Sequence, residues 1–304
     1  MAKSRSTPPS AAQKRLAAER AAAARERIQV AQRRRRLTVI LAAVGAVVVV
    51  AAILVVVKVV SDNGPKSGKK ATTASASVTS TLAGITPSLF DQVGTGSAQS
   101  APQPPKKAQQ PLTSGGKPEI LFIGGEFCPY CAAERWPLTV TLMRFGTFSH
   151  LGQVRSAPDD SAGPDTATLS YHGASYTSRY VDFVGKEIVS NQVNSAGTGW
   201  AKLDSLTASQ SALFKAAGSS FPYLNFDGKY IGSVQFDPKD LGGSSMNQQQ
   251  IAKAITDPST TISKDVLGSA NVDTARICQL TGQKPASVCT SSGVQAAAKA
   301  IGSH

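Results

Sequence analysis

The stretch Glu119-Ile-Leu-Phe-Ile-Gly-Gly-Glu-Phe-Cys-Pro-Tyr-Cys131 decides how the rest of the chain is interpreted. Its apolar run, Ile120–Ile123, has the length of a buried strand and is too short for a helix. Gly124 and Gly125 end this run, and the residues after Cys131 favour a helix. The sequence therefore predicts that Cys128 and Cys131 lie where a buried strand passes into a helix N-terminus.

This position has a chemical consequence for the two thiols. Unpaired N–H groups and the helix dipole stabilise an anion, so Cys128 is expected to ionise more readily than a free cysteine. Two intervening residues on a first helical turn bring the sulfurs within bonding reach, and Pro129 at an early helical position sacrifices no hydrogen bond. The pattern predicts a redox-active pair, with Pro129 and Tyr130 tuning the stability of the thiolate.

The Cys-x-x-Cys pattern has two other interpretations. In a zinc site the second pair of ligands would be Cys278 and Cys289, which have ten residues between them instead of two to four, or histidines, of which the chain has three. We therefore expect no metal and no cofactor. An inert structural disulfide is the other alternative.

Positive charge is concentrated at the N-terminus. Residues 1–36 carry eleven Lys and Arg against Glu19 and Glu26, a net charge of +9, while the whole chain is +13. The remaining residues supply only +4, which argues against nucleic acid as a partner of the folded domain.

An apolar run follows the basic arm. Leu37–Val57 has 21 residues without a charge, about 31 Å as a helix, and no cleavage-site pattern follows soon after. We predict a single uncleaved transmembrane anchor over 37–60, within the bilayer of the cell membrane. Arg33–Arg36 abut its N-terminal end, so the arm is expected in the cytoplasm and the rest of the chain outside. Four cysteines beyond the anchor suit an oxidising compartment.

Residues 61–116 have the composition of a flexible linker, rich in Ser, Thr, Ala, Gly, Pro, Gln and Lys. Within them Leu82–Val93 carries apolar residues at helical spacing, either as a segment docked on the domain or as a transient helix of the linker. The folded domain is predicted over 117–304. Further strands are expected near 153–157, 166–171, 175–179, 180–188 and 221–232, a helix over 203–217, and a helical C-terminal extension with breaks at Asp257-Pro258 and Gly268.

The order strand, Cys-x-x-Cys, helix, then Phe221-Pro-Tyr-Leu-Asn-Phe-Asp-Gly-Lys-Tyr-Ile-Gly232, resembles the thioredoxin superfamily over residues 117 to about 253. The resemblance implies an α/β thioredoxin-like fold with thiol–disulfide oxidoreductase activity on protein thiols. It also implies a cis bond before Pro222, which would pack beside the disulfide and align the substrate strand. The alternative for Pro222 is an ordinary turn proline.

The segment Ser170-Tyr-His-Gly-Ala-Ser-Tyr-Thr-Ser-Arg-Tyr-Val-Asp-Phe183 and the Cys-bearing end, Ile277–Cys289, resemble an uncharacterised family of membrane-anchored thioredoxin-like domains. The resemblance makes 170–187 an insertion, expected to form a substrate-facing or edge surface. Gly282 and Pro285 are turn residues that would let Cys278 and Cys289 meet, and we predict a structural disulfide between them. A second redox pair is the alternative.

One departure from thioredoxins concerns the buried acid six residues before the first cysteine, a position held here by Phe122. Glu126 is a candidate proton relay for Cys131, and a solvated loop carboxylate is the alternative. We expect thiol–disulfide exchange in which Cys128 forms the mixed disulfide and Cys131 resolves it, with a membrane redox partner resetting the pair. A non-catalytic thioredoxin-like binding module and a glutathione-dependent enzyme are the competing functions.

Overall fold

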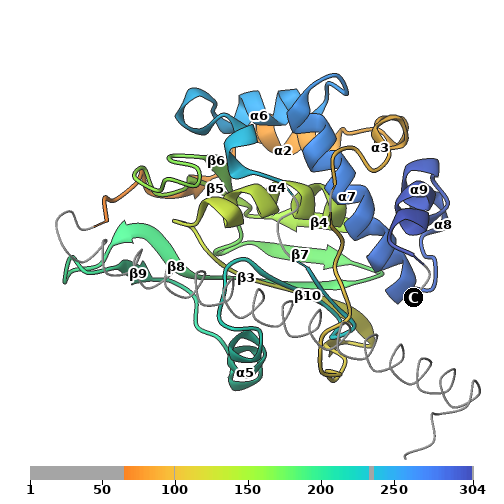
Figure 1. The fold of residues 1–304 in the computed structure, drawn as a ribbon, viewed down its shortest axis with the longest axis horizontal. Helices are drawn as coiled ribbons and strands as arrows, with labels where there is room; N and C mark the ends of the chain where they lie inside the picture. The colour runs from red at the N-terminus through yellow and green to blue at the C-terminus, as the bar shows by residue number, and fades with distance from the viewer. Residues whose placement is uncertain (1–64, 99, 233–235, 303–304) are drawn as a thin grey trace, which may run out of the picture. The chain divides into compact units, whose positions relative to one another are not determined.

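In the computed structural model of the chain, which describes residues 65–98, 100–232 and 236–302, the expected buried strand is β3 (Lys117–Gly125). It lies at the centre of a mixed sheet whose strand order is β11-β10-β3-β8-β9, with β2 (Thr113–Ser114) also paired to β3. β8 runs parallel to β3, whereas β10 runs antiparallel to it (Figure 1). The other strands of this sheet are β8 (Asp182–Val193), β9 (Trp200–Lys202), β10 (Tyr223–Phe226) and β11 (Tyr230–Gly232).

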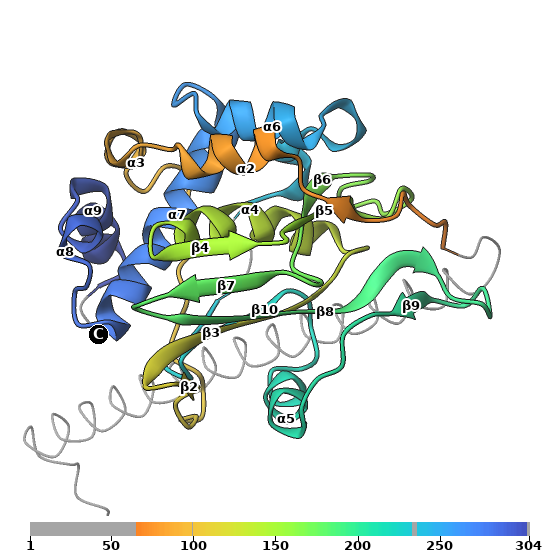
Figure 2. The same cartoon turned by 180° about the vertical axis from the view of Figure 1, so that it is seen from behind.

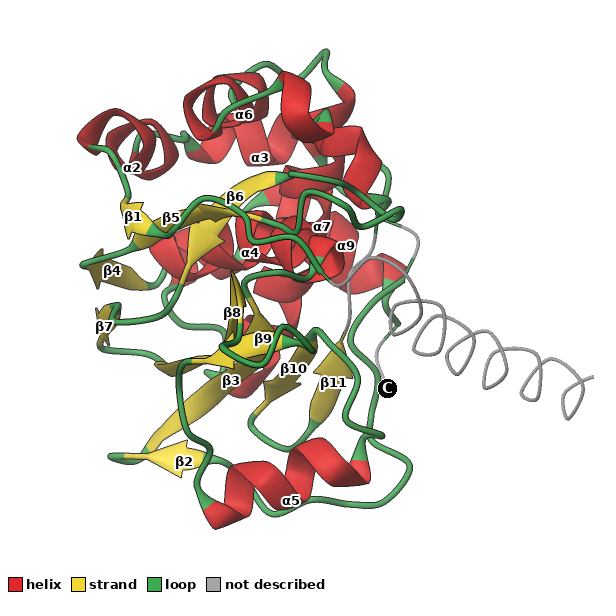
Figure 3. Ribbon diagram, turned by 90° about the vertical axis from the view of Figure 1, so that its left-hand side faces the viewer, coloured by secondary structure: helices red, strands yellow, loops and turns green. Residues whose placement is uncertain are grey.

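Helices cover both faces of this sheet, so β3 is apolar on both sides. Ile120 and Phe122 belong to the larger core, shared with α4 (Pro129–Met143). Leu121 and Ile123 point to the opposite face and form a smaller core with Phe214 of α5 (Ala208–Ala216). Figure 3 shows α5 below the sheet and the remaining helices above it.

The C-terminal helices form a second layer behind α4. α7 (Thr261–Leu280) packs on α4, and α6 (Gln248–Ile255) packs on α7. The predicted break at Asp257-Pro258 separates α6 from α7, but the predicted break at Gly268 is wrong, because α7 continues through it. A Cβ at residue 268 would lie 2.4 Å from the Thr95 carbonyl oxygen, so this glycine permits a close approach of two segments. The remaining short elements are η1 (Pro238–Leu241), η2 (Gly243–Ser245), α8 (Ala286–Cys289) and α9 (Ser292–Ala300).

Two small sheets are built mainly from strands that lie between α4 and β8 in the chain, with β1 joining one of them from before α4. One has the order β1-β5-β6 and the other pairs β4 with β7; their bounds are β1 (Thr72–Thr73), β4 (Gly146–Ser149), β5 (Gly152–Arg155), β6 (Ala167–Ser170) and β7 (Ser175–Ser178). The expected insertion over 170–187 is therefore misplaced, since residues 182–187 belong to β8 in the main sheet. Within this segment β7 is one of the two strands of the β4–β7 sheet, whereas β8 lies between β3 and β9 in the main sheet.

The expectation of a flexible linker over 61–116 is corrected for the described residues. α2 (Ala76–Ala83) and α3 (Pro87–Val93) pack on the domain, with α2 beside α6 (Figure 2). Val78, Leu82 and Phe90 are buried in the larger core. Average composition predicted a linker, but a few apolar side chains at helical spacing suffice to bury one face. The docked alternative for 82–93 is thus the one observed.

The fold is a mixed α/β arrangement, as expected. Among the described residues, no helix is long and apolar enough to cross a membrane. The predicted basic arm over 1–36 and the predicted anchor over 37–60 lie outside the described residues.

Candidate active site

The two cysteines lie at the junction of β3 and α4, as the sequence predicts. Cys128 is the N-cap residue of α4, and its Sγ accepts a hydrogen bond from the backbone N–H of Cys131, at 3.3 Å. Pro129 is the first helical residue. A Cβ at Gly124 would lie 3.1 Å from Cys131 Sγ and 2.6 Å from the Phe122 ring. A glycine is therefore required for this thiol to lie against the end of β3.

The environment separates the two thiols, which are both free in this structure. Cys128 retains 6% exposure and Cys131 none, so the first cysteine is the more accessible one, although only slightly. The hydrogen bond from the Cys131 thiol lowers the pKa of Cys128, with help from backbone N–H groups and the Arg135 charge, against the opposing effect of burial. Burial, together with that same hydrogen bond, raises the pKa of Cys131 well above its ordinary value. Cys128 is thus the thiol prepared to ionise.

Pro222 lies immediately before β10, at the same end of the sheet as the two cysteines. The Phe221–Pro222 peptide bond is cis, as predicted. Tyr223 pairs with Ile123 in the antiparallel register, which places Pro222 at the level of Gly124. Pro222 therefore lies at the same end of the β3–β10 pair as the dithiol, where the sequence expected it.

A row of aromatic side chains borders the cysteines. Phe127 stacks on Trp200, with ring centroids 4.9 Å apart, and contacts Phe221 edge-on, at 6.2 Å. Tyr130, between the two cysteines, is 47% exposed and is the large apolar side chain most open to solvent among the described residues. Sequence analysis missed Trp200, which enters from β9 and has no local motif to mark it.

Glu126 is not a solvated loop carboxylate, so that interpretation is corrected. Its side chain is only 2% exposed and accepts a hydrogen bond from Ser170 Oγ, at 2.7 Å. Burial raises the pKa of Glu126, opposed by the Ser170 hydrogen bond and by the positive charge of Arg135. The buried carboxyl lies two residues before Cys128 and holds a proton more readily than a solvated glutamate.

A fully buried ion pair lies behind the dithiol, and sequence analysis missed it. Arg135 Nε and Nη2 donate to the two carboxylate oxygens of Glu187, each at 2.7 Å. Both side chains are fully enclosed. Two signals could have revealed the pair: Arg135 follows Cys131 by four residues on one helix face, and Glu187 is a lone acid beside the apolar Ile188 and Val189.

A family model described as a domain of unknown function (DUF929) matches residues 103–279. The chain belongs to the DUF929 family. The matched region includes the dithiol, the buried ion pair and Pro222, and it ends between Cys278 and Cys289. No curated protein and no solved structure matches the chain.

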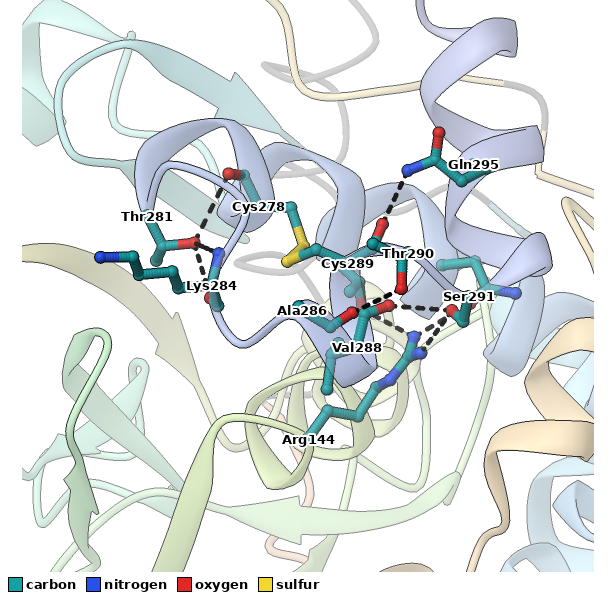
Figure 4. The surroundings of a disulfide bond; sticks show 12 residues. Arg144, Cys278, Thr281, Lys284, Ala286, Val288, Cys289, Thr290, Ser291 and Gln295 are labelled. Carbon is teal, nitrogen blue, oxygen red and sulfur yellow. Dashed lines mark hydrogen bonds between the residues drawn. A yellow bond between two sulfur atoms is a disulfide. The ribbon is translucent and has the colours of Figure 1, made fainter.

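The C-terminal cysteines of this DUF929 protein are joined by a disulfide, as predicted (Figure 4). Cys278 and Cys289 are both buried. Two hydrogen bonds hold the loop between these cysteines. The Gln283 backbone N–H donates to the Cys278 carbonyl, at 2.8 Å, and Gln295 Nε2 donates to the Cys289 carbonyl, at 2.7 Å. These cysteines are committed to each other and do not complete a metal site with Cys128 and Cys131. Among the described residues, no group of three or more His, Cys, Asp or Glu could hold a metal ion.

A second buried pair joins α4 to α7. Glu134 is 2% exposed and Asp273 is fully buried, with no hydrogen-bond partner for either Asp273 oxygen among the described residues. Burial raises the pKa of Glu134 to about 7. Burial and the nearby charge of Glu134 raise the pKa of Asp273 well above its ordinary value. The two carboxyls are therefore most stable in this interface as neutral acids.

The carboxyl pair predicts an alkaline loss of stability. Because both pKa values are raised in the folded state, each group stabilises the fold while it is protonated. The contribution of Glu134 is complete below pH 4.5 and is lost as the pH rises through about 7, and that of Asp273 is lost in the same direction. From Glu134 alone the loss is on the order of 3 kcal/mol, at ~1.4 kcal/mol per pKa unit. Urea unfolding between pH 4 and 8 should show a flatter profile for Glu134→Gln with Asp273→Asn than for the wild type. An unchanged slope would contradict the assignment.

The disulfide predicts a separate outcome under reduction. Its 11-residue separation implies a contribution of about 3 kcal/mol to stability on the chain-entropy model. The Cys278→Ala, Cys289→Ala variant should unfold at a lower temperature and keep its exchange activity. Mild dithiothreitol should open an oxidised Cys128–Cys131 pair first, as followed by mass spectrometry of alkylated peptides. Normal stability with lost turnover would instead assign the C-terminal pair to electron relay.

Proposed function

We propose that this DUF929 protein is a membrane-anchored, extracytoplasmic thiol–disulfide oxidoreductase that acts on protein thiols through Cys128-Pro129-Tyr130-Cys131. The observation that carries the proposal is the arrangement of the two sulfurs at the start of α4. Cys128 Sγ receives the Cys131 N–H, at 3.3 Å, while Cys131 is sealed against Gly124. One thiol is thereby prepared to ionise and the other to stay protonated until exchange requires it.

The topology supports a thioredoxin-like fold as part of this proposal. A strand, the Cys-x-x-Cys helix α4 and a parallel strand β8 form a crossover unit, and β10 and β11 add an antiparallel hairpin on the other side of β3. Asp227 and Gly228 both have positive φ in the hairpin turn, as the Asp-Gly signal requires. The strands β4 to β7 would then be an addition between α4 and β8.

The proposed reaction transfers two electrons from substrate to protein. A substrate thiolate attacks Cys128 Sγ of the oxidised pair, the Cys128–Cys131 bond breaks, and Cys131 leaves as a thiolate that takes up a proton. A second substrate thiolate attacks the substrate sulfur of the mixed disulfide and releases Cys128 as a thiolate. The substrate gains a disulfide, and a disulfide-bearing membrane redox partner must reoxidise the dithiol.

Nearby residues have distinct roles in this scheme. Pro222, at the level of Gly124, would orient the backbone of the substrate segment. Pro129 and Tyr130 set the environment of the thiolate, and the exposed Tyr130 ring with the Phe127–Trp200 stack offers an apolar surface to a polypeptide substrate. Glu126 is the proposed proton acceptor and donor for Cys131, with no metal or cofactor in the scheme.

A non-catalytic binding module is the second candidate function, and one observation favours it. Cys128 is only 6% exposed, so a substrate sulfur needs a local movement to reach it. In this alternative the Cys128–Cys131 pair forms a structural disulfide beside a membrane complex. Insulin reduction and the refolding of a scrambled disulfide protein separate the two functions, because a binding module accelerates neither.

The reaction predicts different outcomes for the two cysteines. Cys128→Ala should abolish exchange, because the attacked sulfur is lost. Cys131→Ala should accumulate mixed disulfides with substrates, because in the reverse direction the Cys128 thiolate still attacks a substrate disulfide and expels one substrate thiolate, while Cys131, which would resolve that adduct, is lost. Non-reducing gels of cells expressing each full-length variant measure this difference. If Cys131→Ala traps nothing and Cys128 alkylates with an ordinary thiol pH profile, the enzyme proposal fails.

The localisation part of the proposal rests on the basic arm and the apolar run, and it makes its own prediction. An alkaline phosphatase fused after His304 should be active, and a reporter that works only in the cytoplasm should be silent there. The same fusions placed after Arg36 should give the reverse result. An active cytoplasmic reporter after His304 would place the dithiol in a reducing compartment and favour a reductant.

A further inference from the structure

The Arg135 side chain is enclosed and its guanidinium is almost completely engaged. In addition to its two bonds with Glu187, Nη2 donates to the Gly125 carbonyl, at 2.8 Å. Nη1 is buried and has no hydrogen-bond partner among the residues that the structure describes. An unsatisfied buried donor is costly, so a site that keeps one has a use for it or a second state in which it is satisfied.

The guanidinium lies at the same end of β3 as the two sulfurs. Gly125, whose carbonyl it binds, is the last residue of β3 before the active-site loop. Glu187 pairs in register with Gly124, against which Cys131 Sγ is packed. Arg135 also follows Cys131 by one helical turn of α4. Three independent elements, α4, β3 and β8, therefore fix one positive charge beside the dithiol.

We propose that Arg135, held in place by Glu187, is a positioning residue that stabilises negative charge on the Cys128–Cys131 dithiol and so makes its disulfide an oxidant. The inference deepens the proposed function, on which it rests, by assigning a direction to the exchange. A cation near the sulfurs stabilises the reduced, thiolate-bearing form more than the neutral disulfide. The Cys128–Cys131 disulfide then oxidises substrate thiols more readily.

The neighbouring charges agree with this role. The guanidinium lowers the pKa of both thiols, while Glu187 acts in the opposite direction on Cys131. Burial would lower the pKa of Arg135, but the Glu187 charge and hydrogen bonds more than compensate, so the cation is retained. Glu187 is necessary because an isolated buried guanidinium would be strongly destabilising. The other charged groups behind the site are Glu126, bonded to Ser170, and Asp204, which accepts the Glu187 N–H, at 2.9 Å, and contacts His172 Nδ1, at 2.8 Å.

The test compares three variants of the full-length protein in detergent. Arg135→Gln with Glu187→Gln removes both charges, Glu187→Gln removes only the anion, and Arg135→Lys keeps the cation. The rate of Cys128 alkylation by iodoacetamide is measured from pH 4 to 10, with mass spectrometry of the Cys128 peptide. The equilibrium constant of the dithiol with glutathione is measured on the same samples.

The proposal expects shifts in opposite directions. The doubly neutral variant should need a higher pH for half-maximal alkylation, with roughly tenfold less thiolate near neutral pH. Its disulfide should be about tenfold less oxidising against glutathione, which corresponds to about 30 mV. Glu187→Gln should shift both quantities the other way, because the guanidinium is then unopposed, and Arg135→Lys should stay near the wild type.

A general loss of packing around the dithiol cannot produce this pattern. It would shift the alkylation profile and the equilibrium with glutathione in the same direction for all variants. The proposal is overturned if Glu187→Gln and the double variant shift alike, if neither shifts, or if Arg135→Lys matches the neutral variant. If Glu187→Gln, which leaves the guanidinium without its anion, does not fold, the contrast between the doubly neutral variant and Arg135→Lys still decides, and equal values for these two variants overturn the proposal. Failure of the proposed function is recognised separately, by shifted alkylation profiles in a protein that neither oxidises nor reduces insulin.

Discussion

The Arg135–Glu187 ion pair is the constraint on which the arrangement of the dithiol depends. Its hydrogen bonds join α4 to β8 across the end of β3. Arg135 Nη2 also donates a hydrogen bond to the Gly125 carbonyl. Because both ions are fully enclosed, neither tolerates loss of its partner, and the spacing of the three elements is fixed by the geometry of one bidentate contact. The loop from Glu126 to Cys128 begins directly after Gly125, whose carbonyl accepts the hydrogen bond from Arg135 Nη2.

The surrounding elements bury the Arg135–Glu187 ion pair and exclude solvent from it. The segment between α4 and β8 supplies Ser170 to Glu126 and the Tyr171 ring, which packs edge-on against Phe122, at 5.2 Å. α7 closes the far side of α4, and the segment before β2 adds α2 and α3 to the same layer. The segment between α4 and β8 thus supplies side chains that bury the ion pair and Glu126. Electrostatic interactions are strongest where water is excluded, so burial and charge act together here.

Much of the fold could be predicted from local signals. The apolar run 120–123, the glycines after it, the Asp227-Gly228 turn and the break at Asp257-Pro258 each reflect a short-range rule, and each is found. The cis bond before Pro222, which the resemblance implied, and the predicted pairing of Cys278 with Cys289 are also found. What failed depends on tertiary contacts. The docking of α2, the continuity of α7 through Gly268 and the burial of Glu126 have no local pattern that specifies them. Local signals mark Arg135 and Glu187 separately, but nothing in the sequence specifies that they meet across 52 residues.

The reduction potential of the Cys128–Cys131 pair tests the account most directly, because it reports on both the redox proposal and the role of the buried cation. Full-length protein would be equilibrated with glutathione buffers, trapped with acid and analysed by mass spectrometry. We predict a reduction potential less negative than about −220 mV, the upper end of the cytosolic glutathione potential, as suits a disulfide donor. A more negative value would contradict the oxidant assignment, and one below about −300 mV would mark the pair as a structural disulfide.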